Sequence, residues 1–547
     1  MLYKLFLGLF LCLCVCIDLF ADEPVNFTFF DDKPRSLAKD FYIYEYLQRD
    51  ETTPKEAKAL FGMVHTMNIR FFHLFAKKMD NLEYKKISKC IDLDVGSLLK
   101  EDDECFNIGI NIGKVTSLSK SQLKLVKPRL KRNNELVNLI TLMESENVYK
   151  TALNSEANTF LTLFNGSITA YKAAIFNQQI IPKEQMDRLS HSAKFNQFAY
   201  NVAQNDKLDN VQKSLLTVTP AAGVNAKALF YLGLNALKYD EKERALYFFE
   251  LSNERTSKGE EKDKALFWQY LVTKDKHYLE RIVQDSDINM YSLYAYEKLE
   301  LPYKNIVSPV LEGTHPSFNI SDPFAWPKIM NRVYKMSAEE VETLAQSFKY
   351  ANTLPHYSYL MERVTHYSKN YYPIPYPEEI ANYSVHRQAL MLAIARQESR
   401  FIPSVVSTSY ALGMMQFMPF VARDIAKKEK LEEFSISNMF DPRIAYLFGN
   451  IHLNFLEKSL YHPLFVAYAY NGGMGFTKKH LQAGAFSQGM YEPFWSMETM
   501  INEESREYGK KVLANYVVYR HLLGDETSIS NLFEILLTPS VTDRFRN

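Results

Sequence analysis

The chain has 547 residues, of which 47% are hydrophobic and 14% aromatic, so it is long enough for several domains with sizeable cores. Its 64 Lys and Arg residues balance its 64 Asp and Glu residues, so no global positive field would attract nucleic acid, and we expect no nucleic-acid partner. The densest basic run lies within residues 114–132. We interpret it as a solvated helix face, with contact to an anionic polymer or a membrane surface as the alternative.

The first residues are typical of a secretion signal. Lys4 precedes an apolar stretch from Leu5 to Ile17, and cleavage after Ala21 would release residues 1–21. The stretch is short for a membrane span and no later segment approaches one, so we expect export without stable membrane insertion.

Cysteine usage fits an exported protein. Of the five cysteines, Cys12, Cys14 and Cys16 would leave with the signal. In an oxidising compartment the remaining pair, Cys90 and Cys105, is predicted to form one disulfide that closes a short loop, worth roughly 3 kcal/mol in the chain-entropy model. The alternative is two separate buried thiols.

The fold class predicted for the whole chain is mainly all-α. Glycine is sparse, at 19 residues, and clear alternating strand patterns are absent. Amphipathic segments recur in pairs, at residues 226–237 with 241–251 and at 264–273 with 276–284. Because such tetratricopeptide-like pairs cannot bury their apolar faces alone, we expect residues 22–310 to stack into a curved helical solenoid, or superhelix.

Prolines mark the expected domain boundaries. Five prolines lie within residues 301–327, and three more interrupt residues 372–377, where they would break any helix. A helical linker domain is therefore predicted over residues 311–375. The last domain is predicted over residues 376–547, and its polar tail, from Thr538 to Asn547, is expected to be loose.

Glu398 is the most informative residue in the chain. Seven apolar residues, 389–395, come shortly before it, and a helix that is apolar all round must be buried. Glu398 would therefore lie where a core helix ends, partly withdrawn from water. A carboxylic acid in such a place resists ionisation and can donate a proton near neutral pH. The alternative is an ordinary helix-end Glu that reaches solvent.

Two segments downstream add groups suited to a sugar. A hydroxyl-rich loop spans residues 404–409, and residues 413–419 (GMMQFMP) then place one amide among apolar side chains. Residues 469–473 (AYNGG) supply a phenol and an amide beside glycines that allow close backbone approach. Sugar sites combine apolar faces for the ring with a few hydrogen-bonding groups for the hydroxyls and acetamides.

Together these segments resemble the catalytic domain of the soluble lytic transglycosylases, which cleave bacterial peptidoglycan and have a goose-lysozyme-like fold. The eighteen-residue step from Glu398 to Gln416 agrees with that family. The family motifs A-I-A-R-Q-E-S, G-L-M-Q-x-M-P, A-Y-N-A-G and E-T-R-x-Y correspond to residues 393–399, 413–419, 469–473 and 504–508. The resemblance also implies the order of an N-terminal α-superhelix, a helical linker domain and a lysozyme-like transglycosylase domain.

The resemblance assigns roles to single residues. It implies that Glu398 is the catalytic acid/base, and that Asn471 shapes the loop that holds a neighbouring phenol. Five side chains would lie in the cleft around the substrate: Ser407, Gln416, Met418, Tyr470 and Glu504.

The chain departs from the family pattern at several positions, among them Ser505 for Thr and Met474 where Pro is usual after Gly473; two others bear on the shape of the site. Tyr410 stands where the family usually has Gly, and Gly472 replaces the usual Ala. Neither departure removes a polar group, so we expect a change in subsite shape rather than in chemistry.

The resemblance implies a reaction that needs one carboxyl group and no cofactor or metal. Glu398 would protonate the oxygen of the β-1,4 bond between N-acetylmuramic acid and N-acetylglucosamine. As glutamate it would then take the proton of the muramic C6 hydroxyl, which attacks C1 and closes a 1,6-anhydro ring. Most glycosidases use a second carboxylate. Here the candidates would be Glu432, Glu433, Asp441, Glu503 and Glu504.

Two other functions remain open at this stage. One is a goose-type lysozyme-like hydrolase, in which Glu398 acts with water as the acceptor. The other is a non-catalytic scaffold that binds the cell wall. For the transglycosylase we expect a monomer in the periplasm, secreted through the signal, with peptidoglycan glycan strands as its partner and cell-wall synthesis or secretion machinery as further candidates.

Overall fold

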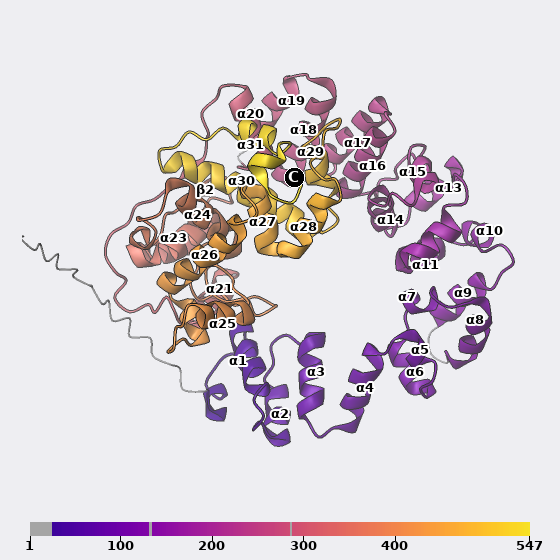
Figure 1. Cartoon of the computed structure of the whole chain (residues 1–547), viewed down its shortest axis with the longest axis horizontal. Coiled ribbons are helices and arrows are strands. Elements are labelled where there is room, and N and C mark those ends of the chain that lie inside the picture. The colour runs from indigo at the N-terminus through magenta and orange to yellow at the C-terminus, as the bar shows by residue number, and fades with distance from the viewer. Residues whose placement is uncertain (1–24, 131–133, 285–286, 547) are drawn as a thin grey trace, which may run out of the picture.

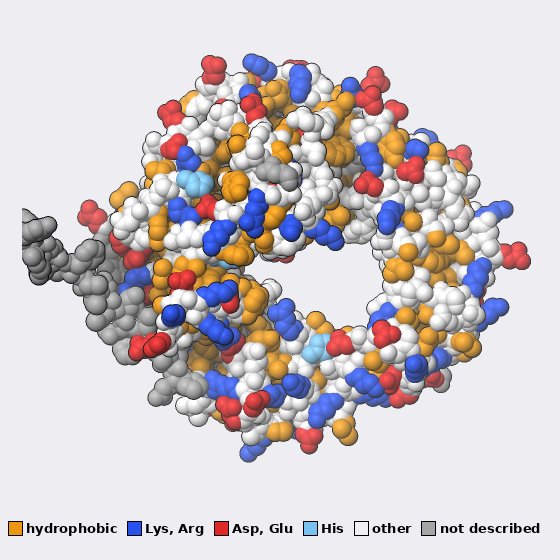
Figure 2. Space-filling model, in the orientation of Figure 1, with side chains coloured by type: hydrophobic (Ala, Val, Ile, Leu, Met, Phe, Trp, Pro, Cys, Tyr) orange, Lys and Arg blue, Asp and Glu red, His pale blue; other side chains and the backbone are white. Residues whose placement is uncertain are grey.

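The computed structural model describes residues 25–130, 134–284 and 287–546. The predicted signal at residues 1–21 lies outside them. The all-α class is confirmed, because helices dominate the described residues and the strands are two residues long. Figure 1 shows the helices arranged in a ring, and Figure 2 shows that an open passage remains through the ring when side chains are drawn at full size.

The N-terminal half is a chain of short helices that forms most of the ring (Figure 1). In chain order its elements are η1 (Phe27–Phe30), α1 (Leu37–Leu47), α2 (Pro54–Phe61), α3 (Ile69–Lys78), α4 (Leu82–Asp92), α5 (Val95–Leu98), α6 (Asp103–Gly109), α7 (Ile112–Val115), α8 (Lys120–Val126), η2 (Lys127–Arg129), α9 (Asn134–Met143), α10 (Val148–Leu153), α11 (Ala157–Gly166), α12 (Thr169–Tyr171), η3 (Lys172–Phe176), α13 (Lys183–Ser190), α14 (Phe195–Ala203), α15 (Asp209–Leu215), α16 (Ala226–Lys238), α17 (Lys242–Glu254), α18 (Gly259–Thr273), α19 (His277–Ile282) and α20 (Met290–Lys298).

The helix pairs expected from the sequence are present. Helices α16 and α17 pack against each other, as do α18 and α19. Gly233 lets the first pair approach closely, since a Cβ built there would lie 2.4 Å from Cε1 of Phe249. Small residues at such crossings therefore fix the spacing of the superhelix.

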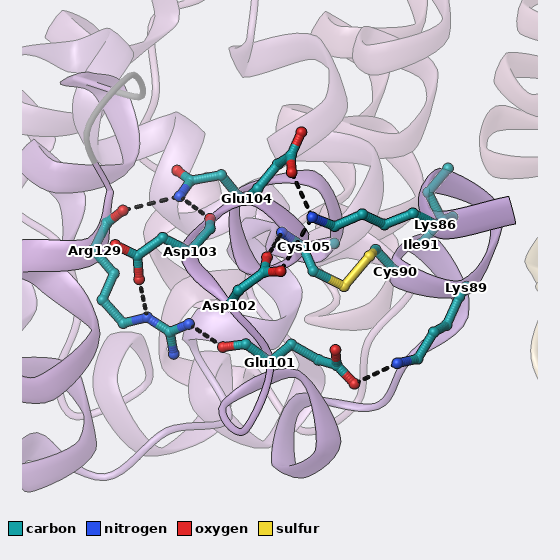
Figure 3. Close-up of a disulfide and its surroundings, with 12 residues drawn as sticks. Lys86, Lys89, Cys90, Ile91, Glu101, Asp102, Asp103, Glu104, Cys105 and Arg129 are labelled. Atoms are coloured by element: carbon teal, nitrogen blue, oxygen red, sulfur yellow. Dashed lines mark hydrogen bonds and ion pairs between the residues drawn. A yellow bond between two sulfur atoms is a disulfide. The ribbon is translucent and has the colours of Figure 1, made fainter. Parts of the chain in front are cut away.

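A disulfide joins Cys90 at the end of α4 to Cys105 in α6 (Figure 3). Charged pairs surround it, among them Lys89 with Glu101 at 2.7 Å. In the basic run that follows, Arg129 pairs with Asp103 at 2.9 Å, as Figure 3 also shows. Part of that run therefore serves local packing of the superhelix.

The linker segment has a core of its own. It contains α21 (Ala325–Val333), α22 (Ala338–Ser347), η4 (Ala351–Thr353) and α23 (Leu354–Val364). Trp326, Phe348 and Leu360 are buried together with Ile402 from the following segment. At the edge of the linker, β1 (Ile306–Val307) pairs in parallel with β2 (Asn370–Tyr371), a feature that the sequence did not predict.

The C-terminal segment packs around three central helices. Its elements are η5 (Pro377–Glu379), α24 (Val385–Ser399), α25 (Pro419–Lys428), η6 (Ile436–Phe440), α26 (Pro442–Glu457), α27 (Pro463–Gly472), α28 (Met474–Gln482), α29 (Phe494–Thr499), α30 (Glu503–Leu522), α31 (Ile529–Ile535) and α32 (Pro539–Thr542). Helix α30 packs closely against both α24 and α27, so these three helices carry the centre of the domain. No helix among the described residues is long and apolar enough to cross a membrane.

The expectation of a loose tail was wrong. Asp543 is fully buried and its carboxylate pairs with Arg546 at 2.8 Å. Arg546 also donates to the carbonyl of Phe486 at 2.8 Å, and the Tyr461 N–H donates to the carbonyl of Thr542 at 2.8 Å. The polar side chains of the tail satisfy one another and nearby carbonyls, so their polarity did not indicate exposure.

The ring closes where its first helix meets the C-terminal segment. The hydroxyls of Tyr42 and Ser437 lie 3.3 Å apart, and Glu45 forms an ion pair with Arg423. On the other side of the ring, helices α16 and α20 contact α29 and α30 through buried polar groups; the Tyr231 hydroxyl, for example, donates to the carbonyl of Glu498 at 3.1 Å.

Candidate active site

Glu398 lies in the last turn of α24, the helix that the apolar run forms. Ser384 caps the start of this helix by accepting from the Arg387 N–H, and the residues of the apolar run are all fully buried. Arg400 ends the helix with a left-handed backbone, φ +53°. The Glu398 side chain is partly exposed at this end, as the sequence predicted for its place in the helix.

The carboxyl group of Glu398 meets a phenol from α30. The Tyr508 hydroxyl donates to Oε1 of Glu398 at 2.8 Å. Burial raises the pKa of Glu398 from its ordinary value of 4.5 to about 7, while the hydrogen bond from Tyr508 lowers it and the charge of Glu504 raises it further. The group is therefore substantially protonated near neutral pH and also has a donor that stabilises its ionised form.

Tyr470 lies close to the same carboxyl group. It is the eighth residue of α27, and its hydroxyl donates to the carbonyl of Met415 at 2.8 Å. Burial and the charge of Glu398 both raise the pKa of Tyr470, so the phenol stays neutral. Its ring lies 5.3 Å from that of His452 and 6.1 Å from that of Phe417, which gives this side of the site an aromatic lining.

Gln416 belongs to a tight loop that folds back on itself. Its backbone is left-handed, with φ +51°, and its side-chain nitrogen donates to the carbonyl of Gly413 at 2.7 Å. A Cβ at Gly413 would lie 2.0 Å from the carbonyl oxygen of Met439, so only glycine fits there. The amide nitrogen of Gln416 is therefore committed to the loop.

Ser407 organises the same loop. Its hydroxyl accepts from the N–H of Ala411 at 2.9 Å, and its own N–H donates to the carbonyl of Ala411 at 3.0 Å. The hydroxyl of Ser399, one residue after Glu398, donates to the carbonyl of Met414 at 2.7 Å. The loop is therefore attached directly to the end of the helix that carries the acid.

Asn471 and Glu504 form the far edge of the site. The side-chain oxygen of Asn471 accepts from the Ser505 hydroxyl at 2.7 Å, and its nitrogen lies 3.4 Å from Oε1 of Glu504. Glu504 is exposed in the first turn of α30. Asn471 thus ties the end of α27 to the start of α30.

The structure brings some of the predicted residues together more closely than others. Glu398 interacts electrostatically with Tyr470 and Glu504. Within residues 25–130, 134–284 and 287–546, no hydrogen bond joins Ser407 or Gln416 to Glu398. Met418 is partly exposed just before α25.

Of the candidate second carboxylates, two serve other purposes. Asp441 caps α26 by accepting from the Arg443 N–H at 2.9 Å. Glu503 pairs with Lys227 of the superhelix at 2.6 Å. Of the candidate second carboxylates among the described residues, Glu504 is the one whose charge raises the pKa of Glu398.

A buried polar network supports α24 from behind. Arg396 donates to the side-chain oxygen of Asn515 at 2.8 Å and to the carbonyl of Tyr371 at 3.0 Å, and it pairs with Glu362 at 3.3 Å. Arg396 is two residues before Glu398, so the linker and α24 are tied together next to the Glu398 carboxyl group. Sequence reasoning gave no role to Arg396 or Tyr508, although both lie in quoted motifs.

Two sizeable cavities lie away from the Glu398 carboxyl group. One of about 570 Å³ lies between the superhelix and α30, lined by Lys264, Tyr291 and Arg506 among others. Another, of about 330 Å³, is lined by Arg396 and Gln397 but not by Glu398. Among the described residues, no group of three or more His, Cys, Asp or Glu side chains is arranged to hold a metal ion.

The fold and the site define a helical protein whose chemistry centres on one partly buried carboxylic acid with a phenol as its hydrogen-bond donor. Residues 375–489 match the family model described as Transglycosylase SLT domain, and this segment belongs to that family. The resemblance seen in the sequence is thereby confirmed.

Known proteins share this segment. Over 168 residues the chain is 29% identical to the soluble lytic murein transglycosylase of Escherichia coli strain K12. The aligned region covers 30% of this chain and 26% of that protein. Over 153 residues it is 34% identical to the membrane-bound lytic murein transglycosylase C of Photorhabdus laumondii, covering 24% of this chain and 43% of that protein. The aligned region thus spans about a quarter to under half of the relatives' length.

A solved structure shows a distant likeness over most of the chain. The crystal structure of the 70 kDa soluble lytic transglycosylase from Escherichia coli covers 90% of this chain and 87% of its own, with 16% identity and a TM-score of 0.45.

Proposed function

We propose that this protein is a peptidoglycan lytic transglycosylase that cleaves the β-1,4 bond between N-acetylmuramic acid and N-acetylglucosamine and leaves a 1,6-anhydro end. The observation that carries the proposal is the Glu398 carboxyl group, whose pKa burial raises to about 7 and which accepts a hydrogen bond from Tyr508. The family of residues 375–489 supports the same reaction class.

In the first step Glu398 is an acid. Its proton passes to the glycosidic oxygen, the bond to C1 of the muramic sugar breaks, and Glu398 becomes a carboxylate. A pKa near the working pH suits this step, because much of the enzyme then carries the proton while the group remains acidic enough to release it.

In the second step Glu398 is a base. The carboxylate takes the proton of the C6 hydroxyl as that oxygen bonds to C1, which closes the anhydro ring and restores the protonated acid. The hydrogen bond from Tyr508 stabilises the carboxylate between the two steps. Since the nucleophile belongs to the substrate itself, effective molarity favours ring closure, and no second carboxylate is required.

The other site residues bind and orient the sugar in this proposal. Tyr470 and Met418 offer apolar surface to the ring, the amide oxygen of Gln416 accepts from a substrate N–H or hydroxyl, and Ser407 holds the loop in shape. Burial is the main reason that the pKa of Glu398 is high, and the charge of Glu504 adds to it. No metal or cofactor takes part in either step.

The proposed function also implies how the chain is divided into domains. We assign residues 22–310 to the superhelix, 311–375 to the linker and 376–547 to the lysozyme-like catalytic domain. We further propose that the protein acts as a monomer in the periplasm on glycan strands, with cell-wall synthesis or secretion machinery as candidate partners.

Mass spectrometry of the products from purified cell-wall sacculi tests the reaction. The wild type should release muropeptides that are one water lighter than hydrolysis products and that lack a reducing end. Glu398→Gln, which keeps the shape but cannot donate the proton, should lower the rate at least about 100-fold. Glu526→Gln, an exposed Glu→Gln change in the same domain, is the matched control and should act like the wild type.

Two results would overturn the proposal in different ways. Products with a free reducing end would make the protein a goose-type hydrolase. No products from the folded wild type would favour the wall-binding scaffold.

A further inference from the structure

The Tyr410 side chain packs against the first helices of the ring. Its side chain is almost completely buried, at 3% exposure. The Tyr410 ring lies 5.1 Å from that of Tyr44 and 6.3 Å from that of Phe41, both on α1, and 6.0 Å from that of Phe71 on α3. We call these three residues, Phe41, Tyr44 and Phe71, the aromatic socket.

The loop around Tyr410 is the one that carries Ser407 and Gln416. The N–H of Tyr410 donates to the carbonyl of Ser407 at 2.9 Å, which closes the turn that Ser407 and Ala411 also form. Tyr410 and Gln416 both have left-handed backbones, with φ of +67° and +51°. Side chains other than glycine rarely adopt this conformation, so the loop needs outside contacts to hold it.

The socket is itself held firmly. The Asp40 carboxylate is fully buried and accepts from the N–H groups of His65 and Thr66, each at 2.7 Å, so the segment before α3 is tied to α1. Helix α1 also contacts the catalytic segment beside the loop, through Tyr42 with Ser437 and Glu45 with Arg423. Helices α1 and α3, joined through Asp40, thus form the surface against which the loop packs.

We propose that Tyr410 is a positioning residue: by inserting into the aromatic socket it lets the N-terminal end of the ring hold loop 404–418 in its substrate-binding shape. The ring is then part of the sugar site rather than only a frame around it. The proposal rests on the function proposed above for the choice of substrate, but the contact itself can be measured without any substrate.

The first experiment measures amide hydrogen exchange of residues 404–418 in the full-length protein. Tyr410→Gly removes the ring and suits the left-handed backbone, while Tyr44→Ala removes the partly exposed wall of the socket from the other side. An aromatic pair of this kind shifts an equilibrium by up to about tenfold, so Tyr44→Ala, which removes one pair with Tyr410, should speed exchange at Ala411 and Leu412 by up to about tenfold. Tyr410→Gly removes all three pairs and should speed exchange there by more.

Two further variants separate positioning from general destabilisation. Tyr410→Phe keeps the ring and should restore slow exchange. Tyr247→Ala removes an exposed tyrosine from α17, far from the loop in the sequence and outside the socket, and should leave exchange in 404–418 unchanged.

The second experiment measures kcat and KM on soluble glycan chains. Tyr410→Gly and Tyr44→Ala should raise KM by the factor by which the fraction of molecules with the loop in its binding shape falls, and should leave the pH dependence of kcat unchanged because Glu398 keeps its surroundings. Tyr410→Phe should return KM to the wild-type value.

Each outcome bears on one claim. Unchanged exchange in both ring-removing variants would overturn the contact between loop and socket, whatever the activity. Faster exchange with an unchanged KM would overturn the positioning role. A wild type that yields no anhydro product would refute the proposed function instead, while the exchange result would still stand.

Discussion

The two faces of α30 place carboxyl groups in opposite electrostatic surroundings. On the face toward α24, Glu398 meets the neutral phenol of Tyr508, and burial raises its pKa to about 7. On the face toward the superhelix, burial also acts on Glu507, but Lys510, Lys264 and Arg506 outweigh it and lower the pKa of that carboxyl well below its ordinary range. Burial therefore leaves a carboxyl group with a raised pKa only where no cation lies close enough to outweigh it.

The difference separates a reactive group from a structural one. Glu498 and Lys510 are 1% and 2% exposed and form an ion pair at 3.0 Å, to which the Tyr291 hydroxyl is also bonded. This network joins superhelix and catalytic segment and holds the helix that carries Tyr508. The ion pair on the charged face of α30 therefore helps to fix the helix from which Tyr508 donates its hydrogen bond to Glu398.

The largest expected effect comes from breaking the charged face. Lys510→Met leaves the buried Glu498 carboxylate without its cation, and losing one partner of a buried pair costs about 3–5 kcal/mol. Denaturant unfolding should show this loss. Lys511→Met changes the next, half-exposed lysine, which lies 3.9 Å from Glu260, and should stay within about 0.5 kcal/mol of the wild type. Equal stabilities for the two variants would remove the distinction between the faces.

A smaller and opposite effect is expected from Glu398→Gln. The folded-state pKa of about 7 is above the unfolded value near 4.5, so between these pH values the unfolded chain releases a proton that the folded protein keeps. The unfolding free energy of the wild type should therefore fall relative to the variant as pH rises through this window.

Above pH 7 the variant should be more stable by about 2 kcal/mol, a figure reduced for the partial exposure of Glu398. Below pH 4.5 the two proteins should unfold alike. A stability difference that does not change with pH would mean that Glu398 ionises normally.

The smallest expected effect concerns the hydrogen bond between Tyr508 and Glu398 on the uncharged face of α30. Tyr508→Phe removes the hydrogen bond that favours the carboxylate, so the pKa of Glu398 should rise and the alkaline fall of activity should move to higher pH. Because the carboxylate between the two steps loses a donor, kcat should drop about tenfold. Tyr516→Phe is the control, because Tyr516 is another tyrosine of α30 and its hydroxyl contacts His386 instead of Glu398. A shift toward lower pH would contradict the role of Tyr508.

Much of the site was readable from the sequence because its signals are local. The apolar run before Glu398 predicts a buried helix with the acid at its end, and the structure agrees. Tyr508 could have been found as the last residue of its motif, but no local pattern shows that its hydroxyl reaches a residue 110 positions away. Contacts between distant segments depend on the packing of whole helices.

The fold, like the site, was predictable where its signals are local in the sequence. Helix pairs at α16–α19 follow from amphipathic spacing, whereas β1 and β2, with two residues each, are too short to show strand alternation. The orientation of Tyr410 could not be foreseen, because its socket comes from residues more than 300 positions earlier in the chain. The tail was misread because its buried Asp543 and Arg546 satisfy each other.

The pH dependence of kcat/KM on a soluble glycan substrate tests the central claim most directly, because it reports the ionisation of the free enzyme's acid. With Glu398 as the only proton donor, activity should fall about tenfold per pH unit above a pKa of about 7. An alkaline fall that begins near pH 4.5, or none at all up to pH 9, would contradict the assignment of Glu398 as the protonated acid.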